Sequence, residues 1–351
     1  MNLTEIESKV KEALTKVEHP TFKENLFDLG MFGRVEEDGE QLRIIVKSPD
    51  EDRRVQIGLE SQLRGVLGKV GIPGKFKIRF EYDPELQPEP LGNRIRGVKN
   101  VIAVGSGKGG VGKSTVTANL AAAMAQMGLK VGVLDADIYG PSIGKMFGFD
   151  GKLSLTGDGK NKISPPEKYG VKVMSFSFLL NPDQAVIWRG PMLGKAVEQF
   201  LYEIMWGELD FLLIDLPPGT GDVQLSLAQL IDLDGALVVT TPQNVAIQDA
   251  TRAVAMFQEV KIPILGVVEN MAEFVCPHCG KTSHIFSKNG GTAFAAKYRV
   301  PFLGSLPLQP DVMEAGESGK PASISDNADD AMRKSYTELA QKLAVEVEKY
   351  K

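Results

Sequence analysis

The chain has 351 residues, 43% of them hydrophobic and 24% charged, and a formal net charge of −5. This composition predicts a globular protein of two domains and excludes a largely disordered chain. The negative charge argues against nucleic-acid or anionic-membrane partners, and no run approaches the roughly 18 apolar residues of a membrane span, so we expect a cytoplasmic protein.

Residues 1–83 have the pattern of a small α+β domain. Apolar residues recur at helical spacing from Ile6 to Val17, which predicts an amphipathic helix. Alternating apolar residues over 42–46 and 76–82 predict strands, and a helical stretch over 55–67 lies between them.

Residues 84–95 contain three prolines in PELQPEP, so this segment is predicted to be a linker. Beyond it, residues 96–351 predict an α/β domain whose mostly parallel sheet is covered by helices on both faces, because short β-rich runs alternate with helix-compatible stretches. Residues 329–351 predict a terminal amphipathic helix. The β-rich runs begin at Val101, Val131, Val171, Phe211, Ala236 and Ile264.

A phosphate-binding loop, GKGGVGKST, lies between the run at Val101 and a helical stretch, which is the context that this motif requires. Its glycines allow backbone N–H groups to surround phosphate oxygens, Lys113 reaches the β and γ phosphates, and Ser114 ligates Mg²⁺. No strong general base lies within the loop, so we expect slow, Mg²⁺-dependent ATP hydrolysis. The predicted nucleotide-binding residues are Gly107, Lys108, Gly109, Gly110, Val111, Gly112, Lys113, Ser114 and Thr115.

Carboxylates follow two of the predicted strands. Asp215 ends the run FLLID, where it would hold Mg²⁺ through water at the carboxyl edge of the sheet. Asp135 and Asp137 follow another strand, and either one would orient the attacking water. The alternative for each of these aspartates is a helix cap or a turn former.

Lys108 is a second lysine inside the loop, and with it the chain resembles the deviant Walker A group that includes MinD, ParA, the nitrogenase iron protein and the Mrp/ApbC iron–sulfur carriers. Within that group it looks like the Mrp/ApbC branch over roughly residues 98–320. The segments that carry the resemblance are GSGKGGVGKST, LDADIYGPS, WRGPM at 188–192, WGELDFLLIDLPPGTGD, TTPQ at 240–243, VVENM and FVCPHCG.

The resemblance implies an ATPase whose nucleotide lies between two subunits of a homodimer. It implies that Lys108 reaches the phosphates of the partner subunit, much as an arginine finger does. It also implies that Asp137 orients the water, that Asp215 lies on the Mg²⁺ side, and that Asn270 in VVENM contacts adenine, although Asn270 alternatively forms a turn.

The N-terminal domain resembles the small iron–sulfur-assembly domain that is often fused to these carriers, with FDLGMFGRV as its best-matching stretch. It departs from that pattern at His19, Pro20 and Thr21, and SPDED from Ser48 contains no cysteine. We therefore assign no cluster or thiol role to this domain.

The chain has two cysteines, Cys276 and Cys279, in CPHCG, a spacing that suits metal binding or redox chemistry. Iron–sulfur and structural zinc sites use four ligands, so a two-fold dimer would complete a four-thiolate site. Zinc on the same thiolates, a single-chain site with His278 and His284, a redox pair and buried apolar thiols are the alternatives. The resemblance implies a bridging [4Fe–4S] cluster.

These observations predict an ATP-hydrolysing iron–sulfur cluster carrier that delivers its cluster to apo-proteins and works with cluster-assembly proteins. Two alternatives remain: a MinD- or ParA-like positioning ATPase, and an ATP-gated assembly scaffold that carries no cluster. The CPHCG pair and the acidic charge favour the carrier.

Overall fold

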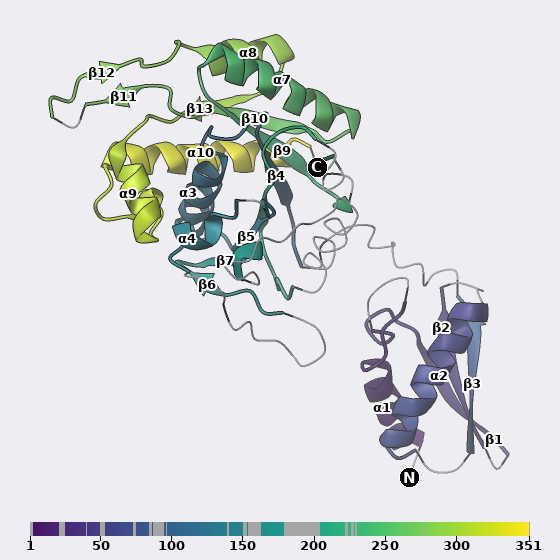
Figure 1. Cartoon of the computed structure of the whole chain (residues 1–351). Helices are drawn as coiled ribbons and strands as arrows, with labels where there is room; N and C mark the ends of the chain where they lie inside the picture. Colours follow the sequence, from purple (N-terminus) through teal and green to yellow (C-terminus); the bar gives the residue numbers. More distant parts are fainter. Residues whose placement is uncertain are drawn as a thin grey trace. The chain divides into compact units, whose positions relative to one another are not determined.

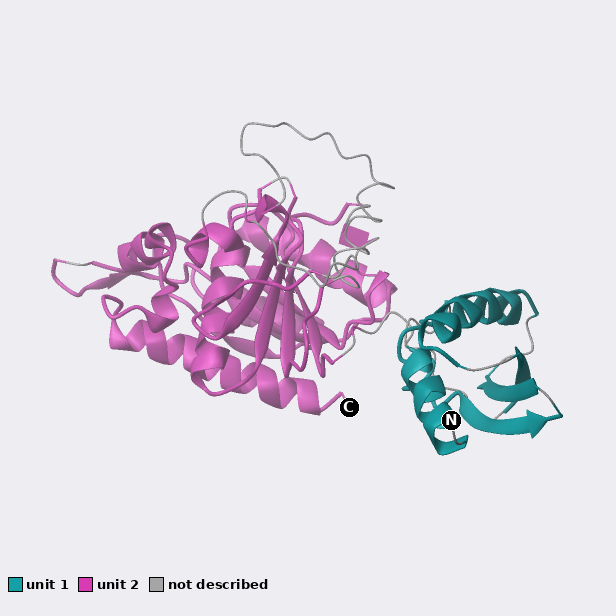
Figure 2. Ribbon diagram, turned by 90° about the horizontal axis from the view of Figure 1, so that it is seen from below, with its two compact units in different colours: residues 1–92 teal, residues 93–351 magenta. Residues whose placement is uncertain are grey.

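The computed structural model divides into two compact units, residues 1–92 and 93–351, coloured separately in Figure 2. The predicted linker lies almost wholly outside the described residues, and so does the WRGPM segment at 188–192. The boundaries proposed for the two domains and the linker therefore stay predictions. The structure describes residues 3–20, 25–39, 41–49, 53–72, 75–83, 86, 95, 97–138, 140–149, 153, 163–178, 204–221, 224–225, 228, 230–276 and 278–350.

The N-terminal unit is a small α+β fold, as predicted. β2 pairs with β1 antiparallel and with β3 parallel, and α2 makes the crossover that a parallel pair requires. Ile44 on β2 lies opposite Ile78 on β3, and such inward-facing residues pack with Leu59 and Leu63 of α2 in one core. The elements are α1 (Leu3–Leu14), β1 (Phe32–Asp38), β2 (Gln41–Ser48), α2 (Arg53–Lys69) and β3 (Lys75–Tyr82).

The C-terminal unit is built on one sheet, whose eight described strands run in the order β13-β10-β9-β4-β8-β5-β7-β6. All neighbouring pairs are parallel except β6 with β7. Every residue of the central strands β4, β8 and β5 is buried, which explains why these strands appear in the sequence as continuous apolar runs. The strands are β4 (Val101–Gly105), β5 (Val131–Asp135), β6 (Glu167–Lys168), β7 (Val171–Ser175), β8 (Phe211–Asp215), β9 (Gly235–Thr240), β10 (Ile264–Glu269) and β13 (Phe302–Ser305).

Helices cover both faces of this sheet, as predicted. α3 and α10 pack together on one face, while α7 and α8 cover the strands β9 and β10 on the other (Figure 1). The fold is therefore an α/β P-loop fold with a mostly parallel sheet. The described helices are α3 (Lys113–Gln126), α4 (Ile143–Met146), η1 (Phe176–Phe178), α7 (Asn244–Glu259), α8 (Gly290–Tyr298), α9 (Pro310–Ser318), η2 (Ala322–Ile324) and α10 (Asp330–Glu348).

The apolar side of the terminal helix α10 is buried inside the protein. The Asp329 carboxylate caps it by accepting from the Ala331 N–H, and Met332, Tyr336 and Leu343 are buried. None of the described helices combines the length and apolar character that a membrane crossing needs.

Besides β1 in the N-terminal unit, three short strand features were not predicted. The edge strands β6 and β13 are two and four residues long, too short for a clear alternation. A hairpin of β11 (Phe274–Val275) and β12 (Thr282–Ser283) lies between β10 and α8, and it extends away from the sheet in Figure 1.

Candidate functional site

The predicted phosphate loop connects the end of β4 to the start of α3. Gly110 and Gly112 have φ angles of 78° and 80°, which residues with side chains rarely adopt. Gly109 and Gly110 are exposed, and no atom lies within 4 Å of a Cβ placed on Gly110. The loop thus has an open side at a helix N-terminus, an arrangement that binds phosphate through backbone N–H groups.

Unlike Gly110, the loop glycines Gly107 and Gly112 are closely packed against neighbouring segments. A Cβ on Gly107 would stand 2.0 Å from the carbonyl carbon of Asp249 in α7. A Cβ on Gly112 would stand 2.2 Å from the side-chain nitrogen of Asn270, which itself donates to the Val111 carbonyl at 2.9 Å. A larger residue at either glycine would displace a neighbour, so tertiary contacts as well as the turn require these glycines.

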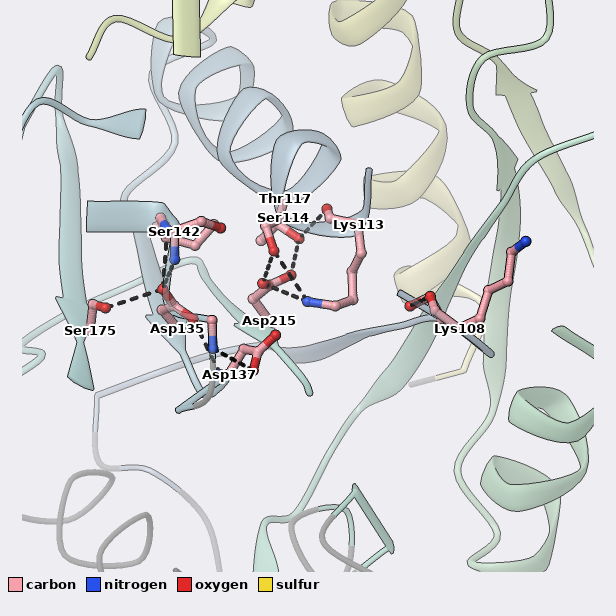
Figure 3. A network of polar contacts seen from close by, with 12 residues as sticks. Lys108, Lys113, Ser114, Thr117, Asp135, Asp137, Ser142, Ser175 and Asp215 are labelled. Carbon is pink, nitrogen blue, oxygen red and sulfur yellow. Dashed lines mark hydrogen bonds and ion pairs between the residues drawn. The ribbon is translucent and has the colours of Figure 1, made fainter. Parts of the chain in front are cut away.

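Asp215 accepts three hydrogen bonds at the carboxyl end of β8. Its Oδ2 accepts from Lys113 Nζ at 2.6 Å and from Ser114 Oγ at 2.5 Å, and its Oδ1 accepts from Thr117 Oγ1 at 2.8 Å. Asp215 is fully buried and Lys113 nearly so. Figure 3 shows the three donors, all from the start of α3, converging on this carboxylate. The structure therefore joins Lys113, Ser114 and Asp215 in one network.

Asp135 lies beside Asp215, because the two are register partners on the neighbouring strands β5 and β8. Asp135 Oδ2 accepts from the N–H groups of Ser142 and Ile143 and from Ser175 Oγ, at 3.0, 3.1 and 3.1 Å. Burial, and after it the neighbouring Asp215 charge, raises the pKa of Asp135 to about 7. Asp135 thus holds the start of α4, which favours the cap interpretation for this residue.

Asp137 follows Asp135 beyond the end of β5. Its N–H donates to Asp135 Oδ1 at 3.2 Å, and its own Oδ1 accepts from the Gly140 N–H at 3.2 Å. Unlike Asp135, it is partly exposed. Of the two carboxylates, Asp137 is thus the more accessible to water, and its role in orienting that water stays a prediction.

Lys108 points in a different direction from Lys113. Figure 3 shows its side chain extending away from the Asp215 network. Its Nζ donates to Gln243 Oε1 at 3.5 Å, a long contact, and its carbonyl accepts from Ser106 Oγ at 3.0 Å. The two lysines of the loop therefore have separate surroundings.

A cavity of about 300 Å³ lies beside the start of α3. Its lining includes Gly112 and Thr115 from the loop, Asn270, and Pro307 and Gln309 from the segment after β13. The volume and the mixed lining suit a small organic group such as a nucleoside. Asn270 lines this cavity, and its contact with adenine stays a prediction.

The donor set as a whole fits a nucleotide with Mg²⁺. The open loop offers backbone N–H groups to phosphate, and Ser114 and Asp215 offer the oxygen ligands that Mg²⁺ prefers, directly or through water. The cavity is next to the same loop, because Gly112 and Thr115 form part of its lining.

The cysteine pair lies at the tip of the β11–β12 hairpin, with Cys279 exposed and Cys276 partly exposed, both as free thiols. The Cys276 N–H donates to the Lys281 carbonyl at 3.0 Å, and the Gly280 N–H donates to the Cys276 carbonyl at 2.9 Å. Hydrogen bonds from the backbone N–H groups of His278 and Cys279 lower the pKa of the Cys276 thiol. These bonds favour the thiolate, which is the form that binds metals.

A metal site within one chain finds no support in the described residues, where no group of three His, Cys, Asp or Glu side chains is placed to hold a metal ion. His278 is exposed, and the Nδ1 atom of His284 lies 3.3 Å from the Ala272 carbonyl oxygen. The interpretation as buried apolar thiols is wrong, because neither cysteine is buried.

Several neighbours of these residues were not identified from the sequence. Thr117 follows Lys113 by one helical turn, so the i, i+4 spacing would have placed it on the same face of α3. Gln243 was part of a matching segment without an assigned role, and it is the partner of Lys108. Pro307 and Gln309 follow β13, a strand that was not predicted.

Comparison with known proteins extends these observations. Residues 97–344 match the family of NUBPL iron-transfer P-loop NTPases. An iron–sulfur cluster carrier protein of Aquifex aeolicus is 52% identical over 263 residues, 75% of this chain and 72% of that protein. The carrier protein of Haemophilus influenzae is 39% identical over 348 residues, 99% of this chain and 94% of the relative.

A solved structure is also similar to this chain. The nucleotide-binding protein of Archaeoglobus fulgidus, in complex with ADP, is 41% identical, with a TM-score of 0.57 over 65% of this chain and 89% of that protein. The matched phosphate loop, the Asp215 network and the paired thiols all lie within the segment that the family match covers. This chain therefore belongs to the iron–sulfur cluster carrier family of P-loop NTPases.

Proposed function

We propose that this chain hydrolyses ATP slowly and carries an iron–sulfur cluster, held between two copies, for delivery to apo-proteins. The observation that carries the proposal is the pair of accessible thiols, Cys276 and Cys279, on a hairpin of a P-loop protein. A [4Fe–4S] cluster takes four thiolates, and a two-fold axis would supply them from two chains. The names of the relatives support this cargo.

The nucleotide would be held by the loop N–H groups, Lys113, Ser114 and Asp215. Bound Mg²⁺ supplies charge neutralisation at the phosphates. Lys113 and the loop N–H groups bind phosphate oxygens and stabilise the negative charge that develops as the terminal phosphoryl group is transferred to water. Asp137 orients that water molecule. We expect slow hydrolysis, because no strong base lies within the loop.

Reconstitution without oxygen tests the cargo. We expect about two iron and two sulfide ions per chain, corresponding to about one four-iron cluster per two chains, with a broad visible absorption band. Zinc bound at about one ion per two chains would instead favour the zinc alternative. Protein that binds neither metal but hydrolyses ATP would support the scaffold.

The direction of Lys108 supports a homodimer, since this lysine extends away from the Asp215 network (Figure 3). We expect Lys108→Ala to lower ATP turnover at least about 100-fold while ATP affinity changes little, because a charge supplied from a second subunit acts mainly in the transition state. Turnover and equilibrium binding are measured on the same preparation, over a range of protein concentrations.

The control for Lys108→Ala is Lys334→Ala on α10, which removes an equally long cation that is 76% exposed. This control is expected to retain turnover. A parallel fall of affinity and turnover in Lys108→Ala, or wild-type turnover per chain that does not depend on protein concentration, would contradict the cross-subunit role.

A further inference from the structure

The hairpin that carries the cysteines is attached at both of its ends to the nucleotide-binding part of the protein. Its outgoing leg, residues 270–273, follows β10, and its return leg, residues 284–289, leads into α8. One leg makes a hydrogen bond to the phosphate loop itself, and the other makes one to the turn after β9.

The outgoing leg contacts the phosphate loop itself. The Asn270 side chain donates to the Val111 carbonyl at 2.9 Å and fills the space in front of Gly112. Its backbone N–H donates to the Thr240 carbonyl at 2.8 Å. The next residue, Met271, has a φ of 55°, which is uncommon for a residue with a side chain. The start of this leg is therefore held against the loop and against the end of β9.

The return leg contacts the turn after β9. Ser287 Oγ donates to the Pro242 carbonyl, and a Cβ on Gly290 would stand 2.8 Å from that same oxygen. One residue further, the Gly291 N–H donates to the buried carboxylate of Glu269 at 2.6 Å, so the return leg is closed onto the end of β10.

The turn that receives the return leg also carries the partner of Lys108. Gln243, whose Oε1 accepts from Lys108 Nζ, is the neighbour of Pro242 along the chain. The outgoing leg is thus bonded to a carbonyl of the nucleotide-binding loop. The return leg is bonded to the carbonyl of Pro242, one residue before the Gln243 that the loop contacts through Lys108.

We propose that these two attachments couple nucleotide binding at the loop to the conformation of the cysteine hairpin, with Ser287 as a positioning residue. The inference rests on the proposed function for its assignment of nucleotide to the loop. A shift of the loop or of the Pro242–Gln243 turn on nucleotide binding moves the base of the hairpin, and by linkage the state of the thiols affects nucleotide affinity equally. The consequence is control of cargo retention by the nucleotide.

Thiol alkylation of the full-length, metal-free, reduced protein tests this coupling. Both cysteines of the chain lie on the hairpin, so the rate of maleimide labelling reports on that segment alone. In the wild type we expect ADP or a non-hydrolysable ATP analogue to change the rate at least about fivefold, the lower end of common coupling strengths. In Ser287→Ala this ratio is expected to fall to below about twofold, with the affinity for ADP retained.

The matched control is Ser283→Ala, the same substitution on β12, where the exposed side chain is next to neither attachment. It is expected to keep the wild-type ratio. Gly290→Ala disturbs the same contact by a clash instead of a lost bond, and it is expected to lower the ratio as Ser287→Ala does.

The outcomes separate this inference from the proposed function. ADP that binds without changing the labelling rate overturns the coupling but leaves the carrier intact, as does an unchanged ratio in Ser287→Ala. A rate change that appears only at high protein concentration assigns the effect to dimer burial and also overturns it. Alkylation requires no cluster, so failure of cluster reconstitution refutes the carrier without altering this result.

Discussion

Replacement of Lys113 with Ala is expected to lower ATP turnover at least about 100-fold. A loss of this size is usual when one preorganised contact to the transition state is removed. Lys113 Nζ lies 2.6 Å from Asp215 Oδ2 in a buried pair, next to the serine that is proposed to ligate Mg²⁺. The substitution removes the one loop cation that points toward this network (Figure 3). Phosphate release by the purified protein measures the effect, with saturating ATP and Mg²⁺.

A second variant keeps this prediction testable if Lys113→Ala unfolds. Removing one partner of a buried ion pair costs about 3 to 5 kcal/mol, because the Asp215 charge would stay buried without its cation. Lys113→Gln retains an N–H donor for that carboxylate and removes the charge, and it is expected to lose turnover equally. Wild-type turnover in a folded Lys113→Gln protein would show that the loop has been misassigned.

Iron binding is expected to fall to background in the double variant Cys276→Ala, Cys279→Ala, while ATP hydrolysis continues. Each chain contributes two thiols to the proposed site, so the double substitution removes all four ligands from a pair of chains. Both cysteines lie at the tip of the hairpin, away from the Asn270 and Ser287 attachments, so the phosphate loop is expected to remain intact. Iron and sulfide content after reconstitution without oxygen, together with phosphate release, gives both results.

A control variant and a mixed dimer accompany this experiment. Ser283→Ala, which leaves both thiols in place, is expected to bind iron as the wild type does. Mixed dimers of tagged wild-type and Cys279→Ala chains have three thiolates, and we expect them to lose their cluster faster than the wild type. An intact cluster on isolated monomers, or full iron binding by the double variant, would refute the bridging site.

The sheet was predictable because its central strands are buried on both faces. The run VIAVG contains no polar side chain, and FLLID is apolar up to its final Asp215; each became a fully buried parallel strand. The strand β13 escaped detection because its four residues, Phe302–Ser305, lie at the edge and carry mixed burial. The hairpin strands have two residues each, which is shorter than any periodicity can reveal.

The candidate site was predictable where the chemistry is local and unpredictable where it depends on contacts distant in sequence. The glycine spacing, Lys113 and Ser114 form a motif within one loop, and the end of an apolar strand indicated Asp215. The bond between Asn270 and Val111 joins residues 159 positions apart, and no spacing rule indicates it. Asp135 resembled Asp137 in the sequence, and the structure distinguishes them by the burial of Asp135 and by the hydrogen bonds that it accepts from the start of α4.

The pairing of β11 with β12 makes the tip of the hairpin, which carries the cysteines, an exchangeable cassette. Val275 at the end of β11 pairs with Thr282 at the start of β12, so the two ends of the cassette are already neighbours, and Asn270 and Ser287 lie outside it. A short turn in its place would satisfy the chain path, because the strand order of the main sheet does not pass through β11 or β12. Cargo chemistry can thus be rewritten on this scaffold, by evolution or by design, independently of the folding of the sheet.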